Sequence, residues 1–160
     1  MQEKETANPP AFTDLAAVPT KGRVLALDPG TKRIGLAVTD ETQTIARPLP
    51  QLERRSWKKV LADIRDIAQE FDAVCLVIGL PLNTDGSESE MSEYARRMAR
   101  NFELSLDIPV VLEDERVTSY EARGRLWQRK GAPADLRGEV DSEAAVIILE
   151  DLLSRRNIII

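Results

Sequence analysis

The stretch VLALDPGTKRIGLAVTD, residues 24–40, decides the fold of this chain. An apolar run ends in a single aspartate, Asp28, and a Pro-Gly turn then leads into a second, alternating apolar run. Two short apolar runs on either side of a turn predict a β-hairpin. Asp28 is therefore either an ordinary turn residue or a carboxylate that the end of a strand holds for chemistry.

The rest of the chain alternates short apolar runs with helical patterns. An antiparallel start followed by β-α-β units predicts a mixed sheet with helices packed on its faces. The elements expected after the hairpin are an edge strand over 44–52, a helix over 56–71, a central parallel strand over 73–80, a helix opened by the capping pair Ser87 and Glu90, a strand over 108–115, a helix opened by Thr118 and Glu121, and a last helix over 141–156.

Length and composition limit the classes of protein. The 160 residues suit one domain, which we expect over 21–156, preceded by a flexible arm over 1–20 and followed by a tail over 157–160. No apolar run approaches the ~20 residues of a membrane span, and the start lacks the features of a signal peptide, so we expect a cytoplasmic protein. The chain has no histidine and one cysteine, which excludes imidazole catalysis and His- or Cys-rich zinc sites.

Acidic residues fall at the ends of the predicted elements. Asp28 ends the first strand of the hairpin, Asp114 and Glu115 end a later strand, and Asp141 opens the last helix. Strand ends of a mixed α/β sheet meet at one edge, and carboxylates gathered there suit Mg²⁺ or Mn²⁺. Each residue also has a plain structural interpretation, because aspartate is common in turns and at helix N-caps, and the acidic pair could simply be exposed.

Basic residues lie close to two of these positions. Lys32 and Arg33 follow Asp28 in the turn and could contact phosphate. A second group surrounds Trp127, an aromatic residue that could stack on a base, and consists of Arg123, Arg129 and Lys130. The alternative is a core tryptophan beside a solvated charged face.

Five blocks of the sequence, in order across residues 22–153, resemble the signature blocks of the YqgF/RuvX family. That family is described as Holliday-junction-resolvase-like and as candidate nucleases for the precursor of small-subunit ribosomal RNA. The blocks are ALDPGTKRIGLAVTD, ARPLP, VIGLPLNTDGSES, EDERVTSYEA and VDSEAAVIILEDLL.

The resemblance implies an RNase H-like fold, in which a mixed five-stranded sheet, antiparallel over its first three strands and then parallel, is flanked by helices. It also implies a metal-dependent nuclease whose catalytic carboxylates match Asp28, Glu115 and Asp141. Asp114 is a second candidate ligand, although strand alternation turns it to the opposite face from Glu115. We add the hypothesis that Arg116, like Lys32, contacts phosphate.

The resulting expectation is a nuclease, dependent on Mg²⁺ or Mn²⁺, that hydrolyses phosphodiester bonds of structured nucleic acid during 5′-end maturation of the ribosomal RNA precursor. Its partner would be precursor RNA or junction DNA, and it would act as a monomer or a homodimer. The alternatives are a Holliday junction resolvase in DNA repair, a non-catalytic RNA-binding module, and a phosphotransferase suggested by the Asp-x-Gly-Thr pattern. The last needs a second domain, for which 160 residues leave no room.

Overall fold

The computed structural model describes residues 11–12, 15–83, 85–115 and 136–158, and within the last helix it describes the side chains of 142–156. The elements, in chain order, are β1 (Ala11–Phe12), a short 3-10 helix (Leu15–Ala17), β2 (Val24–Pro29), β3 (Arg33–Thr39), β4 (Ala46–Glu53), α1 (Trp57–Glu70), β5 (Cys75–Leu80), α2 (Glu90–Ser105), β6 (Val110–Asp114) and α4 (Leu136–Ile158).

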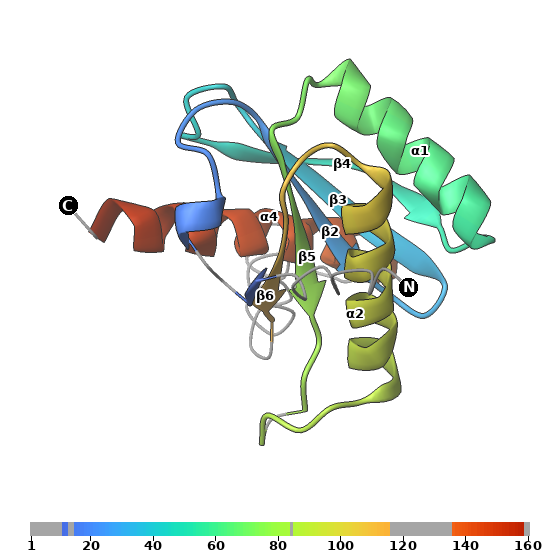
Figure 1. Cartoon of the computed structure of the whole chain (residues 1–160). Coiled ribbons are helices and arrows are strands. Elements are labelled where there is room, and N and C mark those ends of the chain that lie inside the picture. Colours follow the sequence, from blue (N-terminus) through green and yellow to red (C-terminus); the bar gives the residue numbers. More distant parts are fainter. Residues whose placement is uncertain (1–10, 13–14, 84, 116–135, 159–160) are drawn as a thin grey trace, which may run out of the picture.

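The strands form one mixed sheet in the order β1-β6-β5-β2-β3-β4 (Figure 1). β2, β3 and β4 are antiparallel neighbours, whereas β5 and β6 run parallel to β2, as expected for the five principal strands. β5 lies between β2 and β6 with all six residues buried, which confirms the central strand. β4 lies at the edge of the sheet, where Pro48 and Pro50 cost no hydrogen bond to a further strand.

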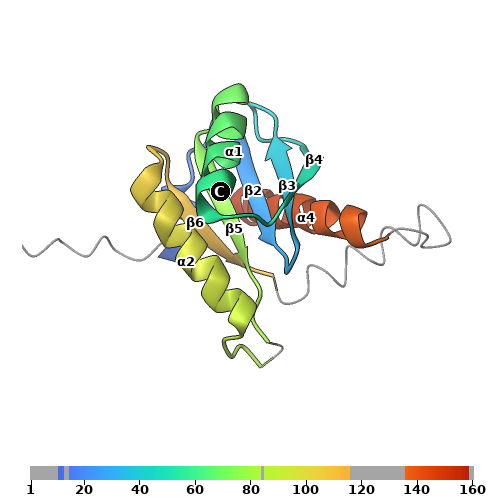
Figure 2. The ribbon, with the colours of Figure 1, turned by 90° about the vertical axis from the view of Figure 1, so that its right-hand side faces the viewer.

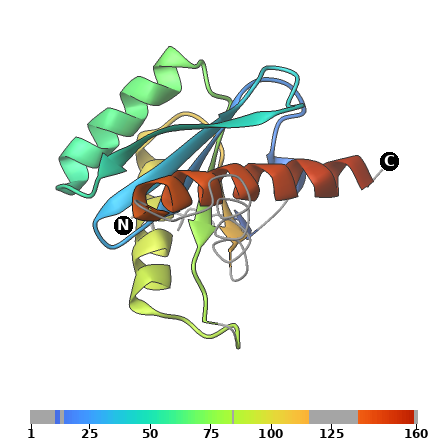
Figure 3. The ribbon, with the colours of Figure 1, turned by 180° about the vertical axis from the view of Figure 1, so that it is seen from behind.

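Helices cover both faces of the sheet. α1 and α2 lie on one face (Figure 2), and α4 crosses the other, as the view from behind shows (Figure 3). Strand alternation separates two cores, so that Leu25 and Leu27 of β2 pack on the α1 and α2 side while Val24 and Ala26 pack on the α4 side. Any side chain at the end of β2 is therefore assigned to one face by its position alone.

The cap of α2 differs from the prediction. The N-cap is Ser89, whose Oγ accepts the Ser92 N–H at 3.2 Å while Ser92 Oγ accepts the Ser89 N–H at 2.6 Å. The predicted cap, Ser87, instead donates its N–H and its hydroxyl to Asp85 Oδ1, at 2.9 and 2.6 Å. The prediction was wrong because Ser87 belongs to the turn that precedes the helix.

The start of the last helix also differs. α4 begins at Leu136, five residues before the predicted start, so Asp141 lies within the helix and is not its N-cap. No proline separates Leu136 from Asp141, and Gly138 lowers helix stability by only about 1 kcal/mol relative to alanine.

Some of the described residues within the expected arm over 1–20 contact the domain. β1 pairs with β6, and Val18 is buried in the core on the α4 side. Arg156 of α4 donates to the Val18 carbonyl at 2.9 Å, and Gln43 Nε2 donates to the Pro19 carbonyl at 2.8 Å. The buried Val18 side chain and the hydrogen-bonded carbonyls of Val18 and Pro19 therefore attach residues 18–19 to the domain.

Across the described ranges, no helix is both long enough and apolar enough to cross a membrane.

Candidate active site

Asp28 lies near the carboxyl end of β2 and is almost fully buried, with 6% of its surface exposed. It pairs with Gly35 of the neighbouring β3, which presents no side chain beside it. By strand alternation Asp28 shares a face with Ala26 and therefore lies on the α4 side of the sheet. The hairpin thus holds a carboxylate under α4 and does not expose it at the tip of the turn.

Glu115 follows β6 and is also 6% exposed. Its N–H donates to the Leu80 carbonyl at 3.2 Å, which ties it to the end of β5. Its carboxylate lies over Gly79 of β5, because a Cβ atom at that position would stand 2.3 Å from Glu115 Oε2. Gly79 therefore provides the space that the Glu115 carboxylate occupies.

Asp28 flanks the same glycine from the other side. The parallel register pairs Leu27 of β2 with Ile78 of β5, so the next step along both strands places Asp28 beside Gly79. Asp28 and Glu115 thus reach the same short part of β5, on the same face of the sheet, from its two neighbouring strands.

Asp114 lies on the other face. It pairs with Leu80. It also shares a strand face with Leu112, two residues earlier, which belongs to the core under α1 and α2. Of the two adjacent acids, Glu115 is the one that shares a face with Asp28.

α4, the helix that contains position 141, crosses this side of the sheet (Figure 3). Position 141 precedes Ala145 and Ile148 by four and seven residues, the spacing of one helix face, and both of those residues are buried in the core on the α4 side. Ile148 Cδ1 would lie 2.8 Å from a Cβ atom at Gly79. The side chain of Asp141 falls outside the described residues, and among those described no three His, Cys, Asp or Glu side chains form a group that could hold a metal ion.

Two further buried acidic residues were not predicted from the sequence. Glu113 is 3% exposed and pairs with Arg155 of α4, and burial raises the pKa of Glu113 to about 7 although Arg155 opposes the shift. Glu143, in the first half of α4, is 7% exposed. The spacing of two residues between Glu113 and Glu115 could have indicated that both lie on the same face of the sheet, the α4 face.

The predicted basic residues divide into two groups. Lys32 is exposed in the turn that follows β2, where its carbonyl accepts the Arg54 N–H at 2.8 Å, and Arg33 is exposed at the first position of β3. The others lie outside the described residues and are Arg116, Arg123, Arg129 and Lys130.

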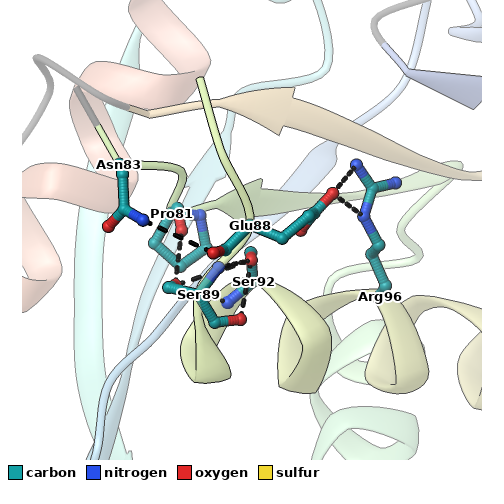
Figure 4. A network of polar contacts seen from close by, with 6 residues as sticks. All are labelled: Pro81, Asn83, Glu88, Ser89, Ser92 and Arg96. Carbon is teal, nitrogen blue, oxygen red and sulfur yellow. Dashed lines mark hydrogen bonds and ion pairs between the residues drawn. The ribbon is translucent and has the colours of Figure 1, made fainter. Parts of the chain in front are cut away.

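The loop after β5 is fixed against the start of α2 (Figure 4). Ser89 Oγ donates to the Pro81 carbonyl at 3.2 Å, and Asn83 Nδ2 donates to the Glu88 carbonyl at 3.4 Å. Arg96 holds the Glu88 carboxylate at 2.7 Å. These contacts support the chain directly after β5, which ends at Leu80, the residue that follows Gly79.

The donor groups at this edge fit a hard divalent cation. Asp28 in β2 and Glu115 directly after β6 provide carboxylate oxygens, the ligands that Mg²⁺ and Mn²⁺ prefer, and β5 lies between these two strands. Gly79 keeps the space between them clear of a side chain. The described pair is thus suited to such an ion.

Comparison with known proteins gives a consistent family. The family described as "RuvX: Holliday junction resolvase" matches residues 22–155. A protein of Anaeromyxobacter dehalogenans (strain 2CP-C) named "Putative pre-16S rRNA nuclease" is 44% identical over 134 residues, which cover 84% of this chain and 98% of that protein. A protein of the same name from Klebsiella pneumoniae (strain 342) is 39% identical over 129 residues, covering 81% and 94%.

Solved structures show the same fold at low sequence identity. The fowlpox virus Holliday junction resolvase superposes with a TM-score of 0.51 at 14% identity, covering 86% of this chain and 99% of that one. The RuvC protein of T. thermophilus in complex with a Holliday junction substrate gives a TM-score of 0.50 at 17% identity, covering 84% and 96%. These likenesses confirm the RNase H-like fold.

Proposed function

The chain belongs to the RuvX family, and from that premise we propose that it is a metal-dependent nuclease that hydrolyses phosphodiester bonds of structured nucleic acid. We further propose that its substrate is the precursor of small-subunit ribosomal RNA and that it acts in 5′-end maturation. The relatives named for pre-16S rRNA support this substrate. The observation that carries the proposal is the pair of buried carboxylates, Asp28 and Glu115, on the two sides of Gly79.

In this proposal Asp28, Glu115 and Asp141 are the catalytic carboxylates and hold Mg²⁺ or Mn²⁺. When bound, a divalent ion supplies charge neutralisation at the phosphate and activation of the attacking water. The protein contributes rigidity, because Asp28 lies in β2, Glu115 directly follows β6, and both of these strands pair with β5. Lys32 and Arg33, exposed four and five residues after Asp28, bind the phosphates of the substrate strand.

The absence of histidine from the whole sequence supports this division of roles. No imidazole can accept a proton or activate a hydroxyl nucleophile. Carboxylates with an oxygen-bound metal ion can supply that chemistry in place of an imidazole. A role in ribosomal RNA processing would place the protein in the cytoplasm, with precursor RNA as its partner.

A second candidate function is the resolution of four-way DNA junctions. The description of the matching family favours it, since that description names a Holliday junction resolvase. The same carboxylates would serve both substrates, and resolution would require a homodimer to make two cuts.

One assay separates these functions. The purified full chain is incubated with Mn²⁺ or Mg²⁺ and, in parallel, with precursor ribosomal RNA, single-stranded RNA and a four-way DNA junction. We expect cleavage of the precursor RNA, its loss with a chelator, and its loss in Asp28→Asn. The matched control is Asp66→Asn, the same charge change at an exposed position of α1, which should cleave as the unaltered protein does.

The outcomes are distinct. Faster cleavage of the junction than of the RNA would support the resolvase. Binding without any cleavage would indicate a non-catalytic module, and cleavage that survives in Asp28→Asn would overturn the proposed site.

A further inference from the structure

A basic pocket lies on the face of the sheet opposite α4, between the β4–α1 junction and α2. Its volume is about 370 Å³, within the range of small-molecule sites. Met98, which is 2% exposed, contributes to its lining. The other lining residues are Arg54, Arg55, Trp57, Tyr94, Arg97 and Asn101.

The charge of this pocket favours an anion. Three of the lining residues are arginines, and no acidic residue lines it among the residues that the structure describes. Arg55 has an ion-pair partner outside the lining, Asp63, at 2.6 Å. Arg97 is exposed on α2 and forms no ion pair with any described residue. The planar guanidinium group binds phosphate through paired N–H donors, so Arg55 and Arg97 are suited to a phosphate group.

Planar groups lie beside these donors. The guanidinium carbon of Arg54 stands 3.6 Å from the centre of the Tyr94 ring. The Trp57 ring is held by an edge contact with Phe102, with ring centres 4.8 Å apart. Bases of unpaired nucleic acid stack on aromatic rings and on guanidinium planes. The combination of arginines with aromatic rings therefore matches a nucleotide better than an inorganic anion alone.

Arg54 connects the pocket to the candidate active site. Its N–H donates to the Lys32 carbonyl at 2.8 Å, and its side chain donates to the Thr31 carbonyl at 3.4 Å. Both acceptors belong to the turn that immediately follows β2, the strand that carries Asp28. The turn that follows β2, with exposed Lys32, therefore contacts a residue that lines the pocket.

We propose that this pocket binds one unpaired nucleotide of the substrate strand, with its phosphate on Arg55 and Arg97 and its base against Trp57 and the Arg54–Tyr94 pair. This assignment rests on the proposed nuclease function and deepens it, because it makes the enzyme selective for structures in which a paired region adjoins an unpaired strand.

The test measures binding in the full chain carrying Asp28→Asn, so that cleavage does not consume the probe. The probes are an RNA hairpin with an unpaired tail, the same hairpin with a blunt end, and adenosine monophosphate. Affinity is measured by fluorescence anisotropy at one fixed salt concentration, because salt weakens every phosphate contact. The variants are Arg97→Glu and, as matched control, Arg100→Glu, the same charge reversal at an exposed position of α2 outside the pocket.

We expect the tailed hairpin to bind more tightly than the blunt one. Arg97→Glu should weaken binding of the tailed hairpin by about tenfold and so remove this difference in affinity, whereas Arg100→Glu should preserve the difference. A second readout needs no change in the pocket. In a Trp127→Phe background Trp57 is the sole tryptophan of the chain, and its fluorescence should be quenched by the tailed hairpin and not by the blunt one.

Equal loss of affinity in Arg97→Glu and Arg100→Glu, without quenching of Trp57, would overturn the proposal. Adenosine monophosphate that binds as tightly as the tailed hairpin would also overturn it, since the occupant would then be a free nucleotide. The catalytic assignment can be contradicted separately. If Asp28→Asn still cleaves while Arg97→Glu loses selectivity for the tail, the pocket proposal is supported and the proposed active site is wrong.

Discussion

Glu115 lies over Gly79, so that a single methyl group on the glycine would stand 2.3 Å from the Oε2 atom of Glu115. The same methyl group would stand 2.8 Å from Ile148 Cδ1 of α4. β5 can therefore pass beneath the carboxylate and the helix only because residue 79 has no side chain. The position of a proposed catalytic group thus depends on a residue with no chemistry of its own.

Gly79→Ala should displace the Glu115 carboxylate and abolish cleavage. Overpacking at such a site lowers the free energy of unfolding by about 1–3 kcal/mol. Urea unfolding measures the stability, and cleavage of precursor RNA measures the activity. Retention of full activity would show that the position of Glu115 over Gly79 does not matter for catalysis.

A double-mutant cycle identifies the cause of the destabilisation. Glu115→Ala removes the closest atom, so Gly79→Ala should cost less unfolding free energy in that background than alone. Part of the cost should remain, because the Ile148 contact is unchanged. Identical costs in both backgrounds would assign the strain to α4 and not to the carboxylate.

Glu115→Gln and Asp114→Asn form a matched pair, since each removes one negative charge from adjacent residues that lie on opposite faces of the sheet. We expect Glu115→Gln to lower the cleavage rate by about a hundredfold or more, and Asp114→Asn to change it by less than about threefold. Single-turnover cleavage rates at a saturating Mn²⁺ concentration provide the comparison. The reverse order of effects would make Asp114 the ligand.

The sequence predicted those parts of the fold that local patterns determine. The hairpin around Asp28 and the central strand Cys75–Leu80 are short runs of buried residues bounded by turns. Such runs indicate β-strands from their local pattern alone. The start of α2 was misplaced because Ser87 and Ser89 are both good caps, and the choice between them depends on the hydrogen bonds of Ser87 to Asp85.

Contacts between elements could not be predicted in the same way. The approach of Glu115 to Gly79 depends on the register of β6 against β5, which no local pattern specifies. The pocket lined by Arg97 likewise exists only because α1 and α2 pack on the same face. Gly79 itself offered a signal, because a glycine inside a buried strand often marks a close approach.

Cys75 should be unreactive in the folded protein. It is fully buried in β5, and burial raises the pKa of its thiol to about 12, so that only ~10⁻⁴ of it is thiolate at pH 8. Labelling with a thiol reagent at pH 8 should be far slower in the native protein than in urea. Rapid labelling without denaturant would contradict the burial of this strand.

Asp40 should make stability depend on pH in the acid range. Its carboxylate accepts hydrogen bonds from the Thr42 hydroxyl at 2.6 Å and from the N–H groups of Ile45 and Thr44 at 3.1 and 2.8 Å. These bonds, that of Thr42 first, lower its pKa from 3.8 to about 2. Because the folded-state pKa is the lower one, the contribution of Asp40 is complete above about pH 4 and is lost as the pH falls towards 2.

Thr42→Val removes the hydrogen bond that lowers the pKa of Asp40 most, and so tests this dependence. The pKa of Asp40 in the folded state should rise towards its ordinary value, so the variant should lose less stability than the unaltered protein between pH 4 and pH 2. Urea midpoints measured at intervals across this range give the slope for each protein. Parallel profiles for the two proteins would show that the Thr42 hydroxyl does not stabilise the Asp40 carboxylate.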